Sequence, residues 1–329
     1  MFLKIFNQLI YFNSKIVSIV LTTLADERKA NHMRRLVLLL MIVFGIMNLT
    51  AQESFTGTFS HDGRERTFRL YLPSGYDEEG DPLPLVIALH PSGSGASGMS
   101  RITGFDTIAE REGFIVMYPE GPFGYWDYGY GTPQWQYIDD ALDDPGFLDR
   151  LIDATVENLN VDESRLFVAG YSNGARMALR LACDAADRIS AVAAVSATIS
   201  TEIIGTCPED SRVSIIYMHG REDQITPWEG KPLFLNNMQI SVARSAPETV
   251  TFWTTQNNCD EDTVEVDDTG EPRIQRFTDC DDGRQVAFYG FENGRHEWFE
   301  RDDFNASEVI WQFFSENPRP PESNPDSED

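Results

Sequence analysis

The sequence predicts an α/β fold in which helices cover both faces of a mostly parallel central sheet. The chain has 329 residues, of which 41% are hydrophobic and 24% are charged, and this composition is typical of a globular protein. Several short runs are apolar on both faces, as the buried strands of a parallel sheet are. Segments with helical periodicity separate these runs, and strands that alternate with helices predict a sheet covered on two sides.

The first expected element is a β-hairpin over residues 55–72. Apolar and polar residues alternate there on either side of His61-Asp62-Gly63, and a short turn of this kind joins antiparallel strands. The expected buried strands follow in chain order at residues 83–90, 114–118, 165–169, 213–219 and 285–291.

Three helices have clear signals. Asp144 is the expected N-cap of the first, because Pro145 follows it and apolar residues then recur at helical spacing up to position 159. A second helix is expected over residues 175–186. The third opens with a capping box at Asn305-Ala306-Ser307-Glu308 and runs through Phe314.

The chain is expected to form one folded domain between a leader and a tail. No linker or repeat interrupts residues 52–316, which we interpret as a single catalytic-size domain. Residues 317–329 are rich in Pro, Ser and Asp, and this composition predicts a disordered acidic tail.

Residues 1–51 are interpreted as a leader. Met33-Arg34-Arg35 precedes an apolar run at 36–47, and a short polar stretch ends at Ala51. This is the pattern of a secretory signal peptide, and its apolar run is too short to span a bilayer comfortably. We interpret residues 1–32 as an upstream misread start. The sequence therefore predicts a protein secreted to the periplasm or the extracellular space, with no stable membrane anchor.

The charge balance excludes some partners. The chain holds 26 Lys and Arg against 53 Asp and Glu, a net charge of −27. A nucleic-acid partner is not expected, because a phosphate backbone binds a basic surface. The acidic residues are best interpreted as a solvated surface.

The strongest chemical motif is Gly170-Tyr171-Ser172-Asn173-Gly174. A Gly-x-Ser-x-Gly turn between a buried strand and an amphipathic helix is a nucleophile elbow, in which the two glycines permit the sharp turn that exposes the serine oxygen. The alternative is a turn with a purely structural role, but the strand before the motif and the helix after it favour a nucleophile.

A serine nucleophile needs a base and an acid that orients it. Asp223 follows the buried strand 213–219, at the sheet edge where ligands bind, and Glu222 is the alternative acid. His296 is the only histidine that follows the last expected strand, and His90 is the alternative base. The order Ser172, Asp223, His296 is that of α/β-hydrolases.

An oxyanion hole needs two backbone donors. The amide of Asn173, directly after the nucleophile, is the first candidate. The second is expected in the loop after strand 83–90, where Pro91 has no N–H and Ser92 is the first residue that can donate.

Four cysteines remain outside the leader, and they suit no zinc site. In an exported chain they predict two disulfides with three possible connectivities. We favour Cys183–Cys207 and Cys259–Cys280, which close the shortest loops, over buried free thiols. No metal and no cofactor are expected.

Residues 123–137 contain seven aromatic side chains among glycines and prolines, which predicts a loop. Aromatic faces suit an aromatic acyl group or a sugar, so Trp126 and Trp135 are candidate substrate contacts. A loop packed down onto the domain is the alternative. Trp228 and Trp298, which follow the acid and the base, are further candidate pocket walls.

Taken in order, these motifs resemble one known family. The loops at His90, Tyr118-Pro119-Glu120-Gly121 and Asp143-Asp144-Pro145-Gly146-Phe147 precede the elbow, and His219 to Asp223 and His296-Glu297-Trp298 follow it. The chain is similar over residues 55–315 to the secreted polyhydroxybutyrate depolymerase and feruloyl esterase family, grouped with family 1 carbohydrate esterases.

The resemblance implies an α/β-hydrolase fold, no metal, the triad Ser172, Asp223 and His296, and the near-neighbour disulfides. This chain departs from the family pattern at Pro91 and Arg295, where glycine is usual, and it lacks the usual Pro-Gly after Trp298. These departures affect the oxyanion loop and the pocket rim.

The expected function is a secreted serine esterase that forms an acyl-enzyme. Its expected substrates are hydroxycinnamoyl or acetyl esters on polysaccharides, and the alternative is a polyhydroxybutyrate or short-chain polyester depolymerase. A serine peptidase would share the triad, and a non-catalytic binding protein would normally have lost one of its members.

Overall fold

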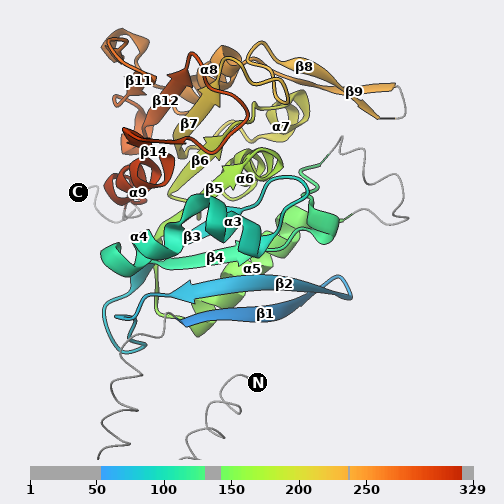
Figure 1. Cartoon of the computed structure of the whole chain (residues 1–329), viewed down its shortest axis with the longest axis vertical. Coiled ribbons are helices and arrows are strands. Elements are labelled where there is room, and N and C mark those ends of the chain that lie inside the picture. Colours follow the sequence, from blue (N-terminus) through green and yellow to red (C-terminus); the bar gives the residue numbers. More distant parts are fainter. Residues whose placement is uncertain (1–52, 130–141, 236–237, 321–329) are drawn as a thin grey trace, which may run out of the picture. The chain divides into compact units, whose positions relative to one another are not determined.

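A ten-stranded mixed sheet forms the centre of the unit Gln52–Asp329 (Figure 1). The computed structural model describes residues 53–129, 142–235 and 238–320. The expected leader and residues 321–329 of the expected tail lie outside the described residues. Asn317 is buried and donates to the carbonyl of Phe313 at 2.9 Å, and the amide of Arg319 donates to that of Ser164 at 2.8 Å, so the predicted start of the disordered tail at residue 317 was wrong. The strands stand in the order β1-β2-β4-β3-β5-β6-β7-β12-β11-β10. Their bounds are β1 (Glu53–His61), β2 (Arg64–Leu72), β3 (Leu83–Leu89), β4 (Ile115–Pro119), β5 (Val161–Tyr171), β6 (Ala191–Val195), β7 (Ser214–Gly220), β10 (Glu265–Asp267), β11 (Arg273–Phe277) and β12 (Val286–Phe291).

The six central strands are parallel, and the two edges are antiparallel. Strands β4, β3, β5, β6, β7 and β12 run in one direction. The β1–β2 hairpin adds to one side through β2, and β11 and β10 add to the other. The predicted mostly parallel sheet is confirmed. The predicted hairpin is also present, and its two-residue turn has positive φ at Asp62 and Gly63, as twisted hairpins require.

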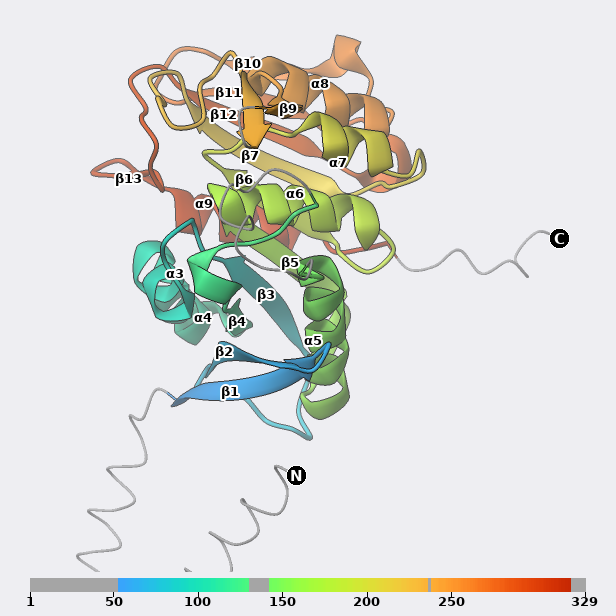
Figure 2. The same cartoon turned by 90° about the vertical axis from the view of Figure 1, so that its right-hand side faces the viewer.

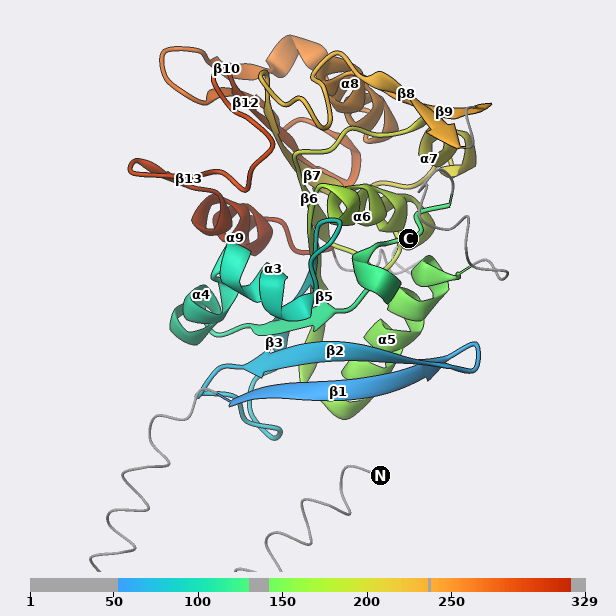
Figure 3. The ribbon, with the colours of Figure 1, turned by 45° about the vertical axis from the view of Figure 1, so that its right-hand side comes forward.

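Helices cover both faces of the sheet, as predicted (Figures 2 and 3). In β3, Leu85, Ile87 and Leu89 pack on one face with residues of α5, α6 and α8, while Val86 and Ala88 pack on the other with α3, α4 and α9. Both faces of the strand are buried, which explains its continuous apolar run. The helices are α3 (Ala96–Thr103), α4 (Phe105–Glu112), α5 (Asp144–Asn158), α6 (Asn173–Asp184), α7 (Thr201–Thr206), α8 (Ala246–Gln256) and α9 (Ala306–Glu316).

The expected N-cap of α5 was wrong by one residue. Asp143 is the cap, and its side chain accepts a hydrogen bond from the amide of Gly146. Asp144 is instead fully buried, where its carboxylate pairs with Arg66 at 2.7 Å and accepts the amide of Asp127 at 2.7 Å. A carboxylate committed to a buried ion pair cannot also turn back to cap its own helix.

The capping box of α9 is only half present. The side chain of Asn305 accepts the amide of Glu308 as predicted. The carboxylate of Glu308 does not return to the cap but pairs with Arg111 of α4 at 2.6 Å.

Some elements escaped the sequence analysis. Strand β6 is short and rich in alanine, and α3 begins in a Gly- and Ser-rich segment, so neither has a strong periodic signal. Helix α8 has a complete capping box at Ser245 and Glu248 that the sequence did offer. Two hairpins were also missed: β8 (Lys231–Leu235) with β9 (Met238–Ala243), and β13 (Glu300–Arg301) with β14 (Phe304–Asn305).

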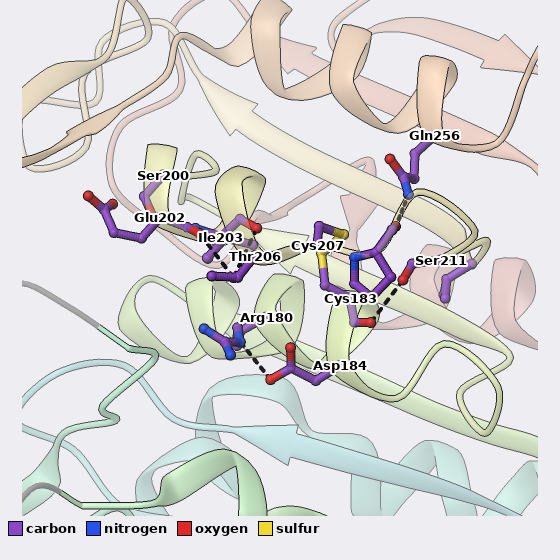
Figure 4. The surroundings of a disulfide bond; sticks show 12 residues. Arg180, Cys183, Asp184, Ser200, Glu202, Ile203, Thr206, Cys207, Ser211 and Gln256 are labelled. Atoms are coloured by element: carbon purple, nitrogen blue, oxygen red, sulfur yellow. Dashed lines mark hydrogen bonds and ion pairs between the residues drawn. A yellow bond between two sulfur atoms is a disulfide. The ribbon is translucent and has the colours of Figure 1, made fainter.

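The four cysteines form the two favoured disulfides. Cys183 at the end of α6 bonds Cys207 at the end of α7, and Cys259 after α8 bonds Cys280 before β12. Around the first bond (Figure 4), Ser211 donates to the Cys183 carbonyl at 2.9 Å. The disulfides therefore tie down the connections on the α6 and α8 side of the sheet.

Candidate active site

Ser172 lies in a sharp turn between β5 and α6, at the carboxyl edge of the parallel strands. Its backbone has φ 54° and ψ −114°, a region that residues other than glycine rarely adopt. Both flanking glycines are required sterically. A Cβ at Gly170 would lie 2.2 Å from the carbonyl oxygen of Gly174, and a Cβ at Gly174 would lie 2.2 Å from that of Leu89. The strand–turn–helix geometry is that of a nucleophile elbow.

The loops after β7 and β12 bring Asp223 and His296 to this serine. His296 Nε2 lies 2.8 Å from Ser172 Oγ, and His296 Nδ1 lies 2.7 Å from Asp223 Oδ2. Ser172 is 8% exposed and Asp223 is 3% exposed. Glu222, the alternative acid, is exposed and lies 3.8 Å from Arg295 instead. The structure therefore joins the three predicted residues in one hydrogen-bonded chain.

Thr226 donates two hydrogen bonds to the carboxylate of Asp223. Its hydroxyl donates to Asp223 Oδ2 at 2.7 Å, and its amide donates to Asp223 Oδ1 at 2.8 Å. The amide of Ile225 also donates to Oδ1 at 2.8 Å. Sequence reasoning missed Thr226, although an aspartate followed by a threonine three positions later favours such a side-chain-to-backbone turn.

The charge state of Asp223 follows from these contacts. Burial by itself raises the pKa of the carboxyl, but the hydrogen bonds from His296 and Thr226 outweigh it and hold the pKa below its ordinary value. An ionised Asp223 accepts the Nδ1–H of His296. The Nε2 atom of that tautomer carries no proton and can accept one from Ser172.

His90, the alternative base, is fully buried and has other contacts. Its Nε2 accepts the amide of Gly121 at 2.9 Å, and its Nδ1 lies 2.9 Å from the carbonyl oxygen of Pro91. Burial lowers the pKa of His90, which favours the neutral form that this pair of bonds requires. His90 thus joins the loop after β3 to the loop after β4.

Hydrogen bonds of Asn173 and Trp126 connect the same two loops to the nucleophile elbow. The side chain of Asn173 accepts the Trp126 amide at 2.7 Å and donates to the Trp126 carbonyl at 3.1 Å. The indole of Trp126 donates to the carbonyl of His90 at 3.0 Å. The backbone amide of Asn173 is at the first position of α6, where N–H groups have no acceptor within the helix. In the loop after β3, Gly93 donates to Gly124 at 2.8 Å, and Ser92 is exposed beside it.

Comparison with known proteins supports the motif analysis. Residues 66–224, a segment that contains Ser172 and Asp223, match the family model described as Esterase PHB depolymerase. The predicted family resemblance is confirmed.

Several named esterases are similar to a larger part of the chain. Feruloyl esterase D of Neurospora crassa is 23% identical over 283 residues, which cover 81% of this chain and 87% of that protein. A bifunctional acetylxylan esterase/xylanase of Neocallimastix patriciarum is 27% identical over 177 residues, or 53% of this chain. The match covers only 24% of that relative, so the chain spans about a quarter of its length.

The solved structure of the acetyl xylan esterase from Aspergillus awamori has a TM-score of 0.55 to this chain. Its sequence identity is 15%, and the alignment covers 79% of this chain and 99% of that one. This likeness confirms the predicted α/β-hydrolase fold.

The aromatic residues predicted to line a pocket are placed differently. Trp126 is completely buried beneath the loops, so its ring offers no surface to a substrate and that prediction was wrong. Trp228 and Trp298 are each only 8% exposed. Trp228 packs on Phe288, and the Trp298 indole donates to the hydroxyl of Ser307. Trp135 lies outside the described residues.

Two exposed apolar side chains near the site were not predicted. Phe123, in the turn η1 (Pro122–Gly124), is 76% exposed, and its φ is 56°. Ile225 is 59% exposed, two residues after Asp223. A bulky residue with positive φ is a genuine outlier, and such strain concentrates at functional sites. Phe123 is therefore the better candidate for an aromatic substrate contact.

The potential metal ligands lie elsewhere. Within the described ranges, one group of His, Asp, Glu or Cys side chains has ligand atoms close enough for a cation: His61, Asp62 and Asp143, at the β1–β2 turn. This group shares no residue with the hydrogen-bonded chain around Ser172. Among the helices of the described residues, none is long and apolar enough to cross a bilayer.

Proposed function

We propose that this protein is a serine esterase that hydrolyses carboxylic esters through an acyl-enzyme intermediate. The observation that carries the proposal is the hydrogen-bonded chain from Asp223 through His296 to Ser172, with distances of 2.7 and 2.8 Å. In this mechanism Ser172 Oγ attacks the ester carbonyl while His296 Nε2 takes its proton. The imidazolium then returns the proton to the leaving alcohol, and water hydrolyses the acyl-serine by the same steps.

The negative oxygen of the tetrahedral intermediate needs preorganised donors. We assign this role to the amides of Asn173 and Ser92. The position of Asn173 at the start of α6 supports the first assignment, because the helix dipole also favours negative charge there. The bond from Gly93 to Gly124 supports the second, because it holds the loop that carries Ser92.

The proposed substrates are feruloyl or acetyl esters on polysaccharides. The names of the relatives support this choice, since one is a feruloyl esterase and two are acetylxylan esterases. The exposed ring of Phe123 suits a cinnamoyl ring or a sugar face. A polyester such as polyhydroxybutyrate is the second candidate, and the description of the matching family model favours it.

Secretion is part of the proposal. The two disulfides support it, since disulfides persist in oxidising compartments. The signal-like pattern after Met33 is the second support.

A substrate panel with a matched pair of variants tests the activity. Purified protein is assayed on methyl ferulate, acetylated xylan, p-nitrophenyl acetate, polyhydroxybutyrate film and a peptide anilide. We expect ester hydrolysis that Ser172→Ala reduces on the order of 10⁴-fold or more. Ser315→Ala, which removes a hydroxyl from the surface of α9, serves as the control and should retain full activity.

The panel also separates the alternatives. Cleavage of the anilide with no ester hydrolysis would indicate a peptidase. Full activity in a folded Ser172→Ala protein would refute the assigned nucleophile. Activity confined to the film would replace the polysaccharide substrate by the polyester.

A further inference from the structure

Among the described residues, Arg176 is a buried cation that has no carboxylate in an ion pair with it, and it lies one helical turn after the nucleophile. Its amide donates to the carbonyl of Ser172 at 3.2 Å, and the residue is only 9% exposed. The Nε and Nη2 atoms are buried and have no hydrogen-bond partner. The guanidinium carbon lies 5.9 Å from the centre of the Tyr128 ring, which places Arg176 beside the loop after β4.

An arginine in this state is energetically unfavourable. A buried donor without an acceptor is unfavourable, and burying an unpaired charge is more unfavourable still. Two other arginines of the described chain show the usual solution. Arg180, one turn further along α6, pairs with Asp184 at 2.6 Å, and the buried Arg66 pairs with Asp144. The chain carries 53 acidic residues, so a general shortage of acids does not explain Arg176.

Lys231 is a second cation, and it lies beside the loop that carries Asp223. It begins β8, and its ammonium donates to the carbonyl of Ile225, two residues after Asp223. No described carboxylate forms an ion pair with it. Burial, followed by the positive charge of Arg176, lowers the pKa of Lys231, while the negative charge of Asp223 acts in the opposite direction. Asp223, the acid nearby, already accepts hydrogen bonds from His296 and Thr226.

Two cations without an ion-pair partner among the described residues therefore lie on elements next to the triad, Arg176 on α6 after Ser172 and Lys231 at the start of β8 after the acid loop. A negatively charged group bound between them would satisfy the free donors of Arg176. A carboxylate matches the forked donors of a guanidinium.

We propose that Arg176 and Lys231 form a subsite for a carboxylate that the ester substrate carries close to the bond that is cleaved. The inference rests on the proposed esterase function and narrows its substrate class to acidic esters. The carboxylate belongs either to the alcohol, as in an acylated uronic acid, or to the acyl group, as in a half-ester of a dicarboxylic acid.

Two matched substrate pairs test the subsite and locate the carboxylate. For the alcohol side the pair is 4-acetoxybenzoate and 4-acetoxybenzamide, and for the acyl side it is 4-nitrophenyl hydrogen succinate and 4-nitrophenyl butanoate. The readout is the ratio of kcat/KM for the charged member to that for the neutral member. We expect the wild type to prefer the charged member of one pair at least tenfold.

The variants Arg176→Gln and Lys231→Gln should each lower this ratio, and Arg176→Gln should lower it roughly 10- to 100-fold, since charge-assisted hydrogen bonds are lost. Arg180→Gln removes a positive charge one turn away and should leave the ratio unchanged. If Arg176 has only a structural role, its loss slows both members of a pair equally. An unchanged ratio in both variants overturns the proposal while the esterase function stands.

Calorimetry gives a readout that does not depend on catalysis. Glutarate and 4-hydroxybenzoate are titrated into the wild type, Arg176→Gln and Arg180→Gln at constant ionic strength. We expect at least one of the two anions to bind the wild type and Arg180→Gln, and to bind Arg176→Gln at least tenfold more weakly. Equal binding to all three proteins overturns the subsite. If no ester is hydrolysed, the proposed function fails and calorimetry still decides the subsite. Should Arg176→Gln fail to fold, Lys231→Gln takes its place in both measurements.

Discussion

Asn173 uses different groups for two tasks at the elbow. Its backbone amide is the proposed oxyanion donor, while its side chain holds the backbone of Trp126 through two hydrogen bonds. Trp126 in turn holds the carbonyl of His90. The loop that carries Ser92 is thereby connected to the nucleophile through buried side chains. Positioning of this kind matters, because a catalytic geometry that loosens by about 1 Å loses much of its rate.

Thr226 is expected to position the acid. Thr226→Val keeps the shape of the side chain but removes the hydroxyl that donates to Asp223 at 2.7 Å. We expect kcat to fall roughly tenfold with little change in KM, because a hydrogen bond to a charged group contributes about 1.5–3 kcal/mol and two backbone donors remain. The pKa of Asp223 should rise, so the acid limb of the pH–rate profile should move to higher pH.

The control for this change is Thr206→Val, whose hydroxyl bonds only to the backbone of its own helix. A pH–rate profile for Thr226→Val that superimposes on that of the wild type would contradict the positioning role.

His219 is expected to make stability depend on pH. It is fully buried beside the acid loop, and burial lowers its pKa from 6.5 to about 4. Because the folded-state pKa is depressed, its contribution to stability is complete above about pH 6.5 and is lost as the pH falls towards 4. Urea unfolding should show the free energy of unfolding decreasing by up to about 3 kcal/mol across this window.

In His219→Asn this decrease in the free energy of unfolding should be smaller. Part of it should remain, because burial also lowers the pKa of His90. His61→Asn, at the β1–β2 turn, serves as the matched control variant. A His219→Asn protein that loses as much stability as the wild type between pH 7 and 4 would show that other groups are responsible.

At the scale of elements, the loop after β4 is expected to influence which ester is recognised. Phe123→Ala removes a ring that is 76% exposed. If the ring contacts an aromatic acyl group, kcat/KM for methyl ferulate should fall by roughly 5- to 100-fold, since burial of such a ring is worth about 1–3 kcal/mol. The value for p-nitrophenyl acetate should fall less.

Phe55→Ala on the edge strand β1 is the matched control, because its ring is also exposed, at 44%. An equal fall on both substrates would mean that Phe123 only shapes the loop. No fall on either would remove Phe123 from the site.

The strands and loops that carry the catalytic residues were predicted from the sequence better than the elements and side chains around them. Apolar runs such as β3 are buried on both faces, so their signal is strong, and the loops after β5, β7 and β12 followed from them. The buried position of Trp126 could not be read from composition, because it depends on a long-range bond to His90. Asp143 and Asp144 are chemically alike, and only the distant Arg66 decides which of them caps α5.

At the scale of the whole molecule, two disulfides stabilise connections on one side of the sheet. Cys183 and Cys207 are separated by 24 residues and Cys259 and Cys280 by 21. By loop entropy each should contribute about 3 kcal/mol. The double variant Cys183→Ser/Cys207→Ser should therefore unfold at a lower urea concentration than the wild type, with the slope of the transition as a check on two-state behaviour.

Thiol titration under denaturant and N-terminal sequencing of exported protein complete this test. We expect no free thiol and a mature chain that begins near Gln52. Four titratable thiols would contradict oxidative folding, and an exported chain beginning at Met1 would contradict the interpreted leader.

The backbones behind the acid and the base touch directly. A Cβ at Gly220 would lie 2.2 Å from the carbonyl oxygen of Gly294, and a Cβ at Gly294 would lie 2.9 Å from the Cα of Gly220. No side chain fits at either position, so neither glycine can be replaced without moving the backbone. Phe123 and Ile225 are exposed, so a different side chain at either position meets no such steric barrier. The tolerance to substitution therefore differs between these positions. Mutant libraries that seek activity on new substrates should vary Phe123 and Ile225 and keep Gly220 and Gly294.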